Sequence, residues 1–259
     1  MANATVTDDK EIKAAPPSGN EGRMPFMLHL RELRDRIVRC CIALLVTVGI
    51  SLALGNYILE LLIAPAPEEA NLVAIRLVEN LSVWFKVSLW SGVIMAMPLL
   101  VYQLFAYVAP GLTSKEKRMI LYFLPGVTFM FICGVAFAYF VALPPALDFL
   151  FGFGLFESMV SIEDYVNVVT RLILAVGLVF ETPLIVMALA RLGVVSPDWL
   201  ASKRRLWIVG AFILSALITP TMDPINQSII AIPLILLLEL GILLSRFVYK
   251  KKREVPQRG

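Results

Sequence analysis

The acid Glu32 stands in the densest run of charge in the chain, HLRELRDRI at residues 29–37. A long uncharged segment follows this run. Glu32 and Arg36 have the i,i+4 spacing at which opposite charges pair on a helix, and Asp35 and Arg39 have the same spacing. The pattern by itself therefore fits an interfacial helix whose charged face pairs with itself.

Two further acids lie inside apolar segments. Glu181 is about 15 Å along its helix from Arg191, near the middle of a membrane. A charge there costs roughly 2.5–3.5 kcal/mol, so the side chain must meet protein, water or a proton. Pro183 predicts a kink beside it, which suits a concave polar surface, although one protonated Glu bonded to a neighbouring helix fits equally well. Glu239, about two turns from Arg246, is predicted to make one structural hydrogen bond between helices.

The sequence offers few residues for enzyme chemistry. His29 is the single histidine, and there is no HExxH motif, no paired CxxC and no Walker phosphate loop. Ser215 and His29 are too far apart in the expected topology to act as nucleophile and base. We therefore expect no enzymatic activity, no catalytic residue, no metal site and no cofactor.

The composition indicates an integral membrane protein. Apolar residues make up 59% of the 259 residues, against about 45–50% in soluble domains, and the mean hydropathy is +0.80. We predict an all-α fold of six transmembrane helices that form a concave, polar-lined surface. The expected spans are roughly 38–59, 84–107, 119–143, 165–190, 206–219 and 228–247.

The last two predicted spans are short. The apolar run Leu206–Thr219 would form about 21 Å of helix, whereas the hydrocarbon core is about 30 Å thick. The turn that follows it, TPTMDPINQ, carries no basic residue. The pair therefore either crosses a locally thinned bilayer or forms a re-entrant hairpin.

Basic residues predict the orientation of the chain. Of the 23 Lys and Arg, all but Arg76, Lys86 and Arg171 lie on or beside the segments assigned to one side of the membrane. Short positively charged loops stay in the cytoplasm, so both termini are predicted to be cytoplasmic. The expected parts are a disordered cytoplasmic tail (1–23), a six-helix transmembrane domain (24–247) and a basic cytoplasmic tail (248–259).

Several separate stretches resemble the TatC family, the multispanning receptor of the twin-arginine protein translocase. They occur in the family's order and cover most of the chain. The matching stretches are HLRELRDRI (29–37), MPLLVYQLFAYVAPGLTSKEKR (97–118), GVAFAYFVALP (134–144), FETP (180–183), ITPTMDPINQSIIAIP (218–233) and LELGILLSRF (238–247).

The resemblance implies roles for individual residues. Glu32 and Glu116 would be the receptor acids, because the guanidinium groups of a signal peptide pair with carboxylates through a planar fork. Arg34 and Tyr107 would complete the signal-peptide site, and Tyr107 stands where other members commonly carry Phe. The polar positions implied inside or at the outer side of the concave surface are Glu181, Asp223 and Gln227.

The same resemblance implies export of folded proteins across the cytoplasmic (inner) membrane, driven by the protonmotive force. Expected partners are TatA-type and TatB-type single-span subunits, twin-arginine signal peptides, membrane lipids and further copies of the chain, but no nucleic acid. The alternative is a proton-coupled secondary transporter of small solutes that uses Glu181 and Glu239. Paired repeats with broken helices would favour that alternative, and none is evident in the sequence.

Overall fold

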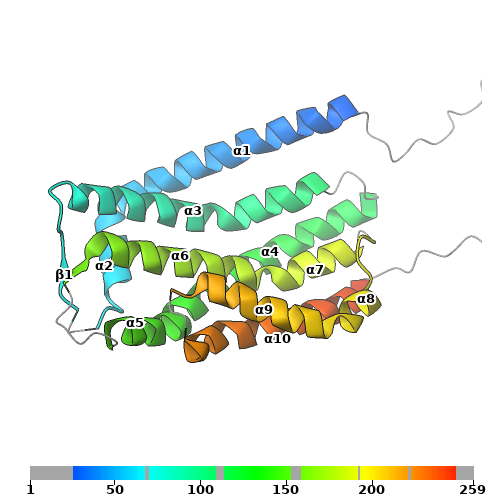
Figure 1. Ribbon diagram of the computed structural model, residues 1–259. Helices are drawn as coiled ribbons and strands as arrows, with labels where there is room; N and C mark the ends of the chain where they lie inside the picture. The colour runs from blue at the N-terminus through cyan, green and yellow to red at the C-terminus, as the bar shows by residue number, and fades with distance from the viewer. Residues whose placement is uncertain are drawn as a thin grey trace, which may run out of the picture.

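The computed structural model describes residues 26–67, 70–108, 114–152, 159–191, 193–220 and 223–248. The predicted tails at 1–23 and 248–259 lie outside these ranges, apart from Val248. Long helices run alongside one another, and the first and last described residues lie at the same end of the bundle (Figure 1).

Five helical segments among the described residues are long and apolar enough to cross a membrane. These segments are Leu30–Ala53, Glu79–Leu104, Pro125–Gly152, Ile162–Arg191 and Pro224–Phe247. The predicted all-α membrane fold is therefore confirmed. Helix α9 (Arg204–Ile218) has only 15 residues, short of the roughly 20 that a full crossing needs. The sixth crossing thus stays a prediction.

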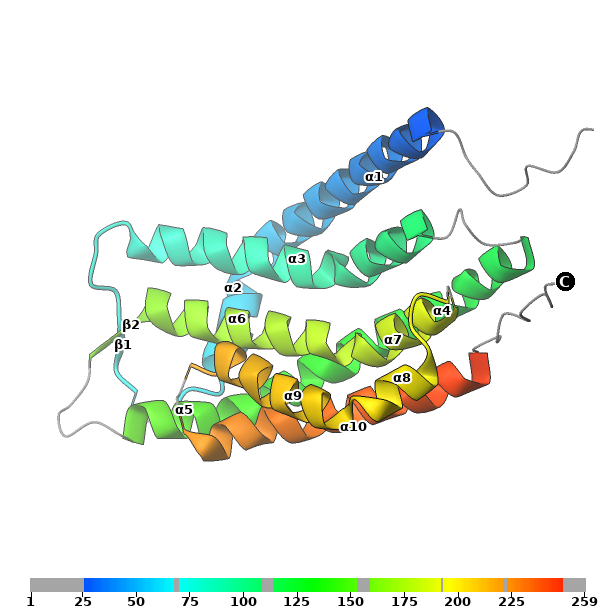
Figure 2. The same ribbon diagram turned by 45° about the vertical axis from the view of Figure 1, so that its right-hand side comes forward.

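The first predicted span, 38–59, is wrong at its end. Helix α1 (Phe26–Ala53) ends at Ala53, before the predicted end of the span. Helix α2 (Gly55–Ile63) then turns away from α1 (Figure 2). At this corner a Cβ on Gly55 would lie 2.6 Å from the indole nitrogen of Trp84 in α3 (Glu79–Val108). A residue without a side chain suits such a close approach, which explains the glycine at this corner.

The third span is longer than the predicted 119–143. Helix α4 (Ser114–Phe137) passes through a π-helical stretch, η2 (Ala138–Ala142), into α5 (Leu143–Gly152). Prolines at 144 and 145 lack the N–H that an α-helix would use. A π-helical stretch changes the hydrogen-bond spacing inside a helix. The span therefore continues to Gly152 as one helical segment.

Helix α6 (Ile162–Phe180) is the central element of the bundle. It lies between α3 and α9 in Figure 2 and packs against both. Val166, Val169, Ile173 and Val176 are buried at spacings of three and four residues, which defines one apolar face of the helix. After a break at Glu181 the chain continues as α7 (Thr182–Arg191).

The last part of the fold is a helical hairpin. The short helix α8 (Pro197–Ser202) leads into α9, which packs against α10 (Pro224–Val248) (Figure 1). Helix α8 is capped by Ser196, whose hydroxyl accepts a hydrogen bond from Trp199 N at 3.2 Å. Helix α8 and the last turn of α10 therefore lie at the same end of the bundle as the start of α1 (Figure 1).

The opposite end of the bundle carries a small parallel pair of strands, β1 (Leu72–Val73) and β2 (Val160–Ser161) (Figure 1). Beside it, the Glu79 side chain is 1% exposed. It accepts hydrogen bonds from the backbone N–H of Ile75 at 2.7 Å and of Arg76 at 2.9 Å, and from the Ser161 hydroxyl. This carboxylate therefore joins the loop before α3 to the loop before α6.

Arg76 and Lys86, two of the three basic residues that lie away from the predicted cytoplasmic side, form ion pairs at this same end. Arg76 and Lys86 both donate to the carboxylate of Glu163, in the first turn of α6. The single carboxylate of Glu163 therefore compensates only part of the positive charge that these two residues bring to this end.

Candidate functional site

Glu32 is held against α3 by a neighbouring arginine. Its Oε1 atom accepts hydrogen bonds from Arg36 Nη2 at 2.5 Å and from Arg36 Nε at 3.1 Å. Arg36 Nη1 in turn donates to Oε1 of Gln103 on α3 at 3.1 Å. Both donors to Glu32 converge on one oxygen, and Oε2 has no hydrogen bond among the described residues.

Gln103 was not singled out in the sequence analysis. It is 8% exposed and lies near the end of α3, four residues before Tyr107. Its signal in the sequence is a polar amide inside the apolar run MPLLVYQLFAYV, where a lone polar side chain needs a partner. Its partner, Arg36, is 67 residues away, so the pairing becomes visible only in the fold.

One predicted ion pair of α1 is wrong. Asp35 accepts from Arg34, with Nη2 to Oδ1 at 2.9 Å, rather than from Arg39. The Arg34 and Asp35 side chains are 70% and 51% exposed, so this pair is solvated and weak. Arg39 has no hydrogen bond or ion pair to any residue in the described part of the chain.

The other two residues of the predicted signal-peptide site lie on α3 and α4. Tyr107 is half-buried near the end of α3. Glu116 lies in the first turn of α4, and its side chain is outside the described part of the structure. The start of α4 is at the same end of the bundle as the start of α1 (Figure 1). The fold therefore brings Glu32 and Glu116 to one end of the molecule.

The sequence predicted a helix kink beside Glu181, and this kink is confirmed. It separates α6 from α7 and is 1% exposed. Pro183 removes the helical donor to the carbonyl of Val179, and the hydroxyl of Thr182 takes its place at 2.6 Å. Neither carboxylate oxygen of Glu181 has a hydrogen bond among the described residues. A buried carboxylate without a partner is costly.

Asp223 and Gln227 connect the hairpin rather than contacting Glu181. Asp223 accepts hydrogen bonds from the backbone N of Asn226 at 2.8 Å and from its side-chain amide at 3.0 Å, which caps α10. Gln227 Nε2 donates to the carbonyl of Phe212 on α9 at 2.8 Å. The predicted polar patch is thus two features: a buried acid in α6–α7 and a polar α9–α10 junction.

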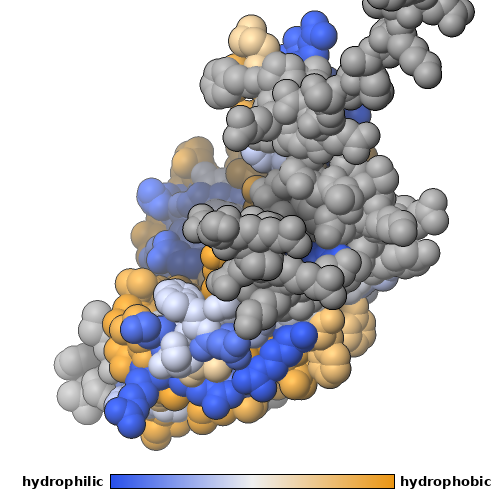
Figure 3. Space-filling view, turned by 90° about the vertical axis from the view of Figure 1, so that its right-hand side faces the viewer, coloured by the Kyte–Doolittle hydropathy of each residue, from blue (hydrophilic) through white to orange (hydrophobic). Residues whose placement is uncertain are grey.

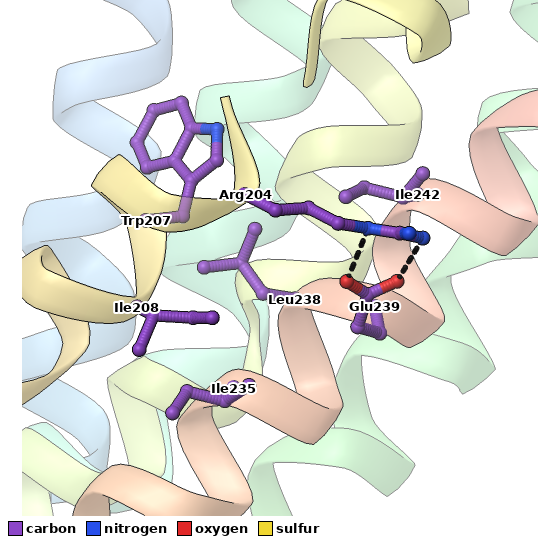
Figure 4. Close-up of a pocket in the computed structure, with 7 residues that line it drawn as sticks. All are labelled: Arg204, Trp207, Ile208, Ile235, Leu238, Glu239 and Ile242. Carbon is purple, nitrogen blue, oxygen red and sulfur yellow. Dashed lines mark hydrogen bonds and ion pairs between the residues drawn. The ribbon is translucent and has the colours of Figure 1, made fainter. Parts of the chain in front are cut away.

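Glu239 bonds between helices, as predicted, and its partner is Arg204 of α9. Figure 4 shows the guanidinium fork facing the carboxylate, with Nε to Oε1 and Nη2 to Oε2 both at 2.7 Å. Leu238 and Ile242 lie beside the pair. Two parallel hydrogen bonds fix orientation as well as distance, so the pair aligns α9 on α10.

These features define a multi-pass α-helical membrane protein that carries an arginine-bound acid at one end and an unpaired acid within its bundle. A family model, Sec-independent protein translocase protein (TatC), matches residues 28–233. The chain belongs to the TatC family.

Relatives and solved structures agree with this membership. The Sec-independent protein translocase protein TatC of Aquifex aeolicus (strain VF5) is 38% identical, covering 90% of this chain and 100% of that protein. The protein of the same name from Escherichia coli (strain K12) is 34% identical, covering 90% of this chain and 92% of that one. The crystal structure of a twin arginine translocase receptor, TatC, is 38% identical, with a TM-score of 0.72 over 85% of this chain and 99% of that chain.

Proposed function

We propose that this chain is the signal-peptide receptor and core subunit of a translocase that exports folded proteins bearing twin-arginine signals. The observation that carries the proposal is the Glu32 carboxylate, which is fixed in place yet has one oxygen unused by Arg36. A receptor for arginines needs carboxylates, because a guanidinium forms its strongest pairs with them. The family membership supports the same function.

The parts of the receptor site have separate roles. Glu32 accepts one signal arginine through Oε2, while Arg36, anchored on buried Gln103, keeps the carboxylate from rotating away. Glu116 supplies a second acid from the start of α4. Tyr107 presents an aromatic face, on which a guanidinium stacks well. Arg34 is exposed and meets lipid head groups or the polar part of the signal.

We place this end of the bundle in the cytoplasm and the chain in the cytoplasmic membrane. The end that holds the start of α1 also holds the exposed basic residues before and at the start of α9, Lys203, Arg204 and Arg205. Figure 3 looks onto this end and shows hydrophilic residues gathered on it, with hydrophobic residues along its lower rim. Short basic segments are retained in the cytoplasm, which supports this orientation.

The driving force and partners in the proposal follow the family. The chain would work with TatA-type and TatB-type single-span subunits and with further copies of itself, using the protonmotive force and no nucleotide. No enzymatic step is assigned to it. The family match does not favour the alternative function, a proton-coupled transporter of small solutes.

A photocrosslinker placed at position 32 tests the receptor function. We expect it to capture a signal peptide with two consecutive arginines and to lose most of that capture with a twin-lysine control. Lysine is a point charge and cannot reproduce the planar fork. Equal capture of both peptides would mean that this surface attracts positive charge without recognising arginine, and the receptor assignment would fail.

A second prediction concerns Glu181, which we propose contributes a polar patch that meets partner helices or the passing chain. Glu181→Gln keeps the shape and hydrogen-bonding capacity, so assembly should persist with a modest loss of export. Glu181→Leu removes a buried carboxylate that has no partner, and so it should not lower the folding stability. It should nevertheless reduce crosslinking to partner helices and export.

Thermal unfolding and export measured on the same two variants separate these effects. Full export by Glu181→Leu would make the acid dispensable. A melting temperature well below that of the wild type would show that the acid stabilises the fold instead.

A further inference from the structure

Helices α1 and α3 enclose an apolar groove. Its volume is about 470 Å³, within the range of about 300–1,000 Å³ typical of ligand sites. Ile42, Val46 and Thr47 line it from α1, and Met95 and Leu99 line it from α3. The Thr47 hydroxyl donates to the Ala43 carbonyl at 3.0 Å, so its hydrogen is already bonded within α1.

The two helices are joined above and below this groove. On the outer side, Gly92 of α3 packs against α1 so closely that a Cβ there would lie 2.7 Å from Val48 Cα. On the cytoplasmic side, Arg36 bonds Gln103 at 3.1 Å. Figures 1 and 2 show α1 diverging from α3 toward the N-terminal end of α1. The groove is therefore set by fixed contacts between the helices rather than by a loose surface.

One charged residue, Arg39, lies at the cytoplasmic end of the groove. It has no hydrogen bond or ion pair in the described part of the chain, because its candidate partner Asp35 binds Arg34 instead. From Arg39 to Thr47 the apolar wall runs for about 12 Å along α1. The groove thus combines an unpaired cation at the membrane surface with an apolar channel pointing into the membrane.

We propose that this groove binds one anionic phospholipid, with the phosphate on Arg39 and an acyl chain along Ile42, Val46 and Met95. Charge complementarity selects this occupant, because a Lys or Arg near the cytoplasmic leaflet attracts anionic lipid. A signal peptide brings positive charge to the same end of α1, and Arg39 repels it. The acyl chain fills the space that the two helices leave open between their contacts at Gly92 and at Gln103.

Native mass spectrometry of the full-length protein in detergent tests the proposal, with phosphatidylglycerol and phosphatidylcholine as probes. We expect the wild type to retain one phosphatidylglycerol in preference to phosphatidylcholine. Arg39→Gln should reduce that preference at least fivefold. Arg31→Gln is the matched control, since Arg31 is exposed on the same helix outside the groove, and it should leave the preference unchanged.

A second variant tests the acyl-chain part of the site. Ala43→Phe fills the groove with Arg39 intact, and we expect it to lose the retained lipid of either kind. A phosphatidylglycerol with a photoreactive acyl chain should label the wild-type segment 42–47 and not Ala43→Phe. Unchanged retention in both Arg39→Gln and Ala43→Phe would overturn the proposal, as would equal labelling of segment 42–47 in the wild type and in Ala43→Phe.

Discussion

Alanine in place of Glu32 is expected to weaken binding of a twin-arginine signal peptide by about ten- to a hundredfold, and alanine at Glu116 should have an effect of similar size. A hydrogen bond to a charged group contributes about 1.5–3 kcal/mol, and 1.4 kcal/mol corresponds to a factor of ten in affinity. The Glu32 side chain is only 25% exposed, so water screens its pairing less than at an open surface.

The combination of the two variants is more informative than either alone. If the two acids hold one ligand, the loss in the double variant should differ from the sum of the single losses in free energy. Glu116→Lys should be worse than Glu116→Ala, because it adds repulsion to the lost pair. The measurement is signal-peptide affinity in purified membranes.

Asp198→Ala is a suitable control for these measurements, because Asp198 is an exposed acid in the first turn of α8, at the same end of the bundle. It should bind the signal as the wild type does. If the Glu32 and Glu116 double variant bound the signal with wild-type affinity, Glu32 would have no receptor role. It would only pair with Arg36 on the surface of an interfacial helix.

Valine in place of Gly92 is the second change with a large expected effect. A Cβ at this position would lie 2.5 Å from Val48 Cγ2 and 2.9 Å from Val48 N. The second of these atoms is backbone, so the clash cannot be relieved by rotating a side chain. Overpacking of this kind typically costs about 1–3 kcal/mol, and here the whole of α1 must move away from α3.

This movement should also affect the receptor site. Displacing α1 lengthens the contact between Arg36 and Gln103, which is the described hydrogen bond that anchors Glu32 to α3. We therefore expect Gly92→Val to lower both the melting temperature and the affinity for the signal peptide. Gly49→Ala is the matched control: nothing lies within 4 Å of its Cβ, and alanine favours a helix over glycine. Equal stability of the two variants would show that α1 and α3 are not tightly packed.

Predictions from the sequence agree best with the structure where a structural feature depends only on residues within one helix. The apolar runs predicted helices because lipid offers no partner for an open backbone. The break at Glu181 follows from Pro183, whose ring and missing N–H act on its own helix. The short α9 follows from the length of its apolar run.

The partners of individual charged side chains were harder to predict, even within one helix. The i,i+4 spacing suggested Arg36 for Glu32 and Arg39 for Asp35, and only the first pair forms. Spacing along a helix limits which residues can meet, but exposed ion pairs differ in free energy by less than about 1 kcal/mol. Such small differences do not decide between neighbouring arginines.

The amino-acid sequence alone determined the membrane class, the helical spans and the presence of acids in places where charge is expensive, because these depend on composition and on spacing within one segment. Only the tertiary structure decided that Gln103 anchors Arg36 and that Arg204 pairs with Glu239. It also decided that Glu181 has no hydrogen-bond partner in the part of the chain that the structure describes. These outcomes depend on how helices far apart in sequence pack against one another. A polar group buried in such packing takes whichever partner the neighbouring helix brings within about 3 Å, and periodicity along its own helix carries no information about that neighbour.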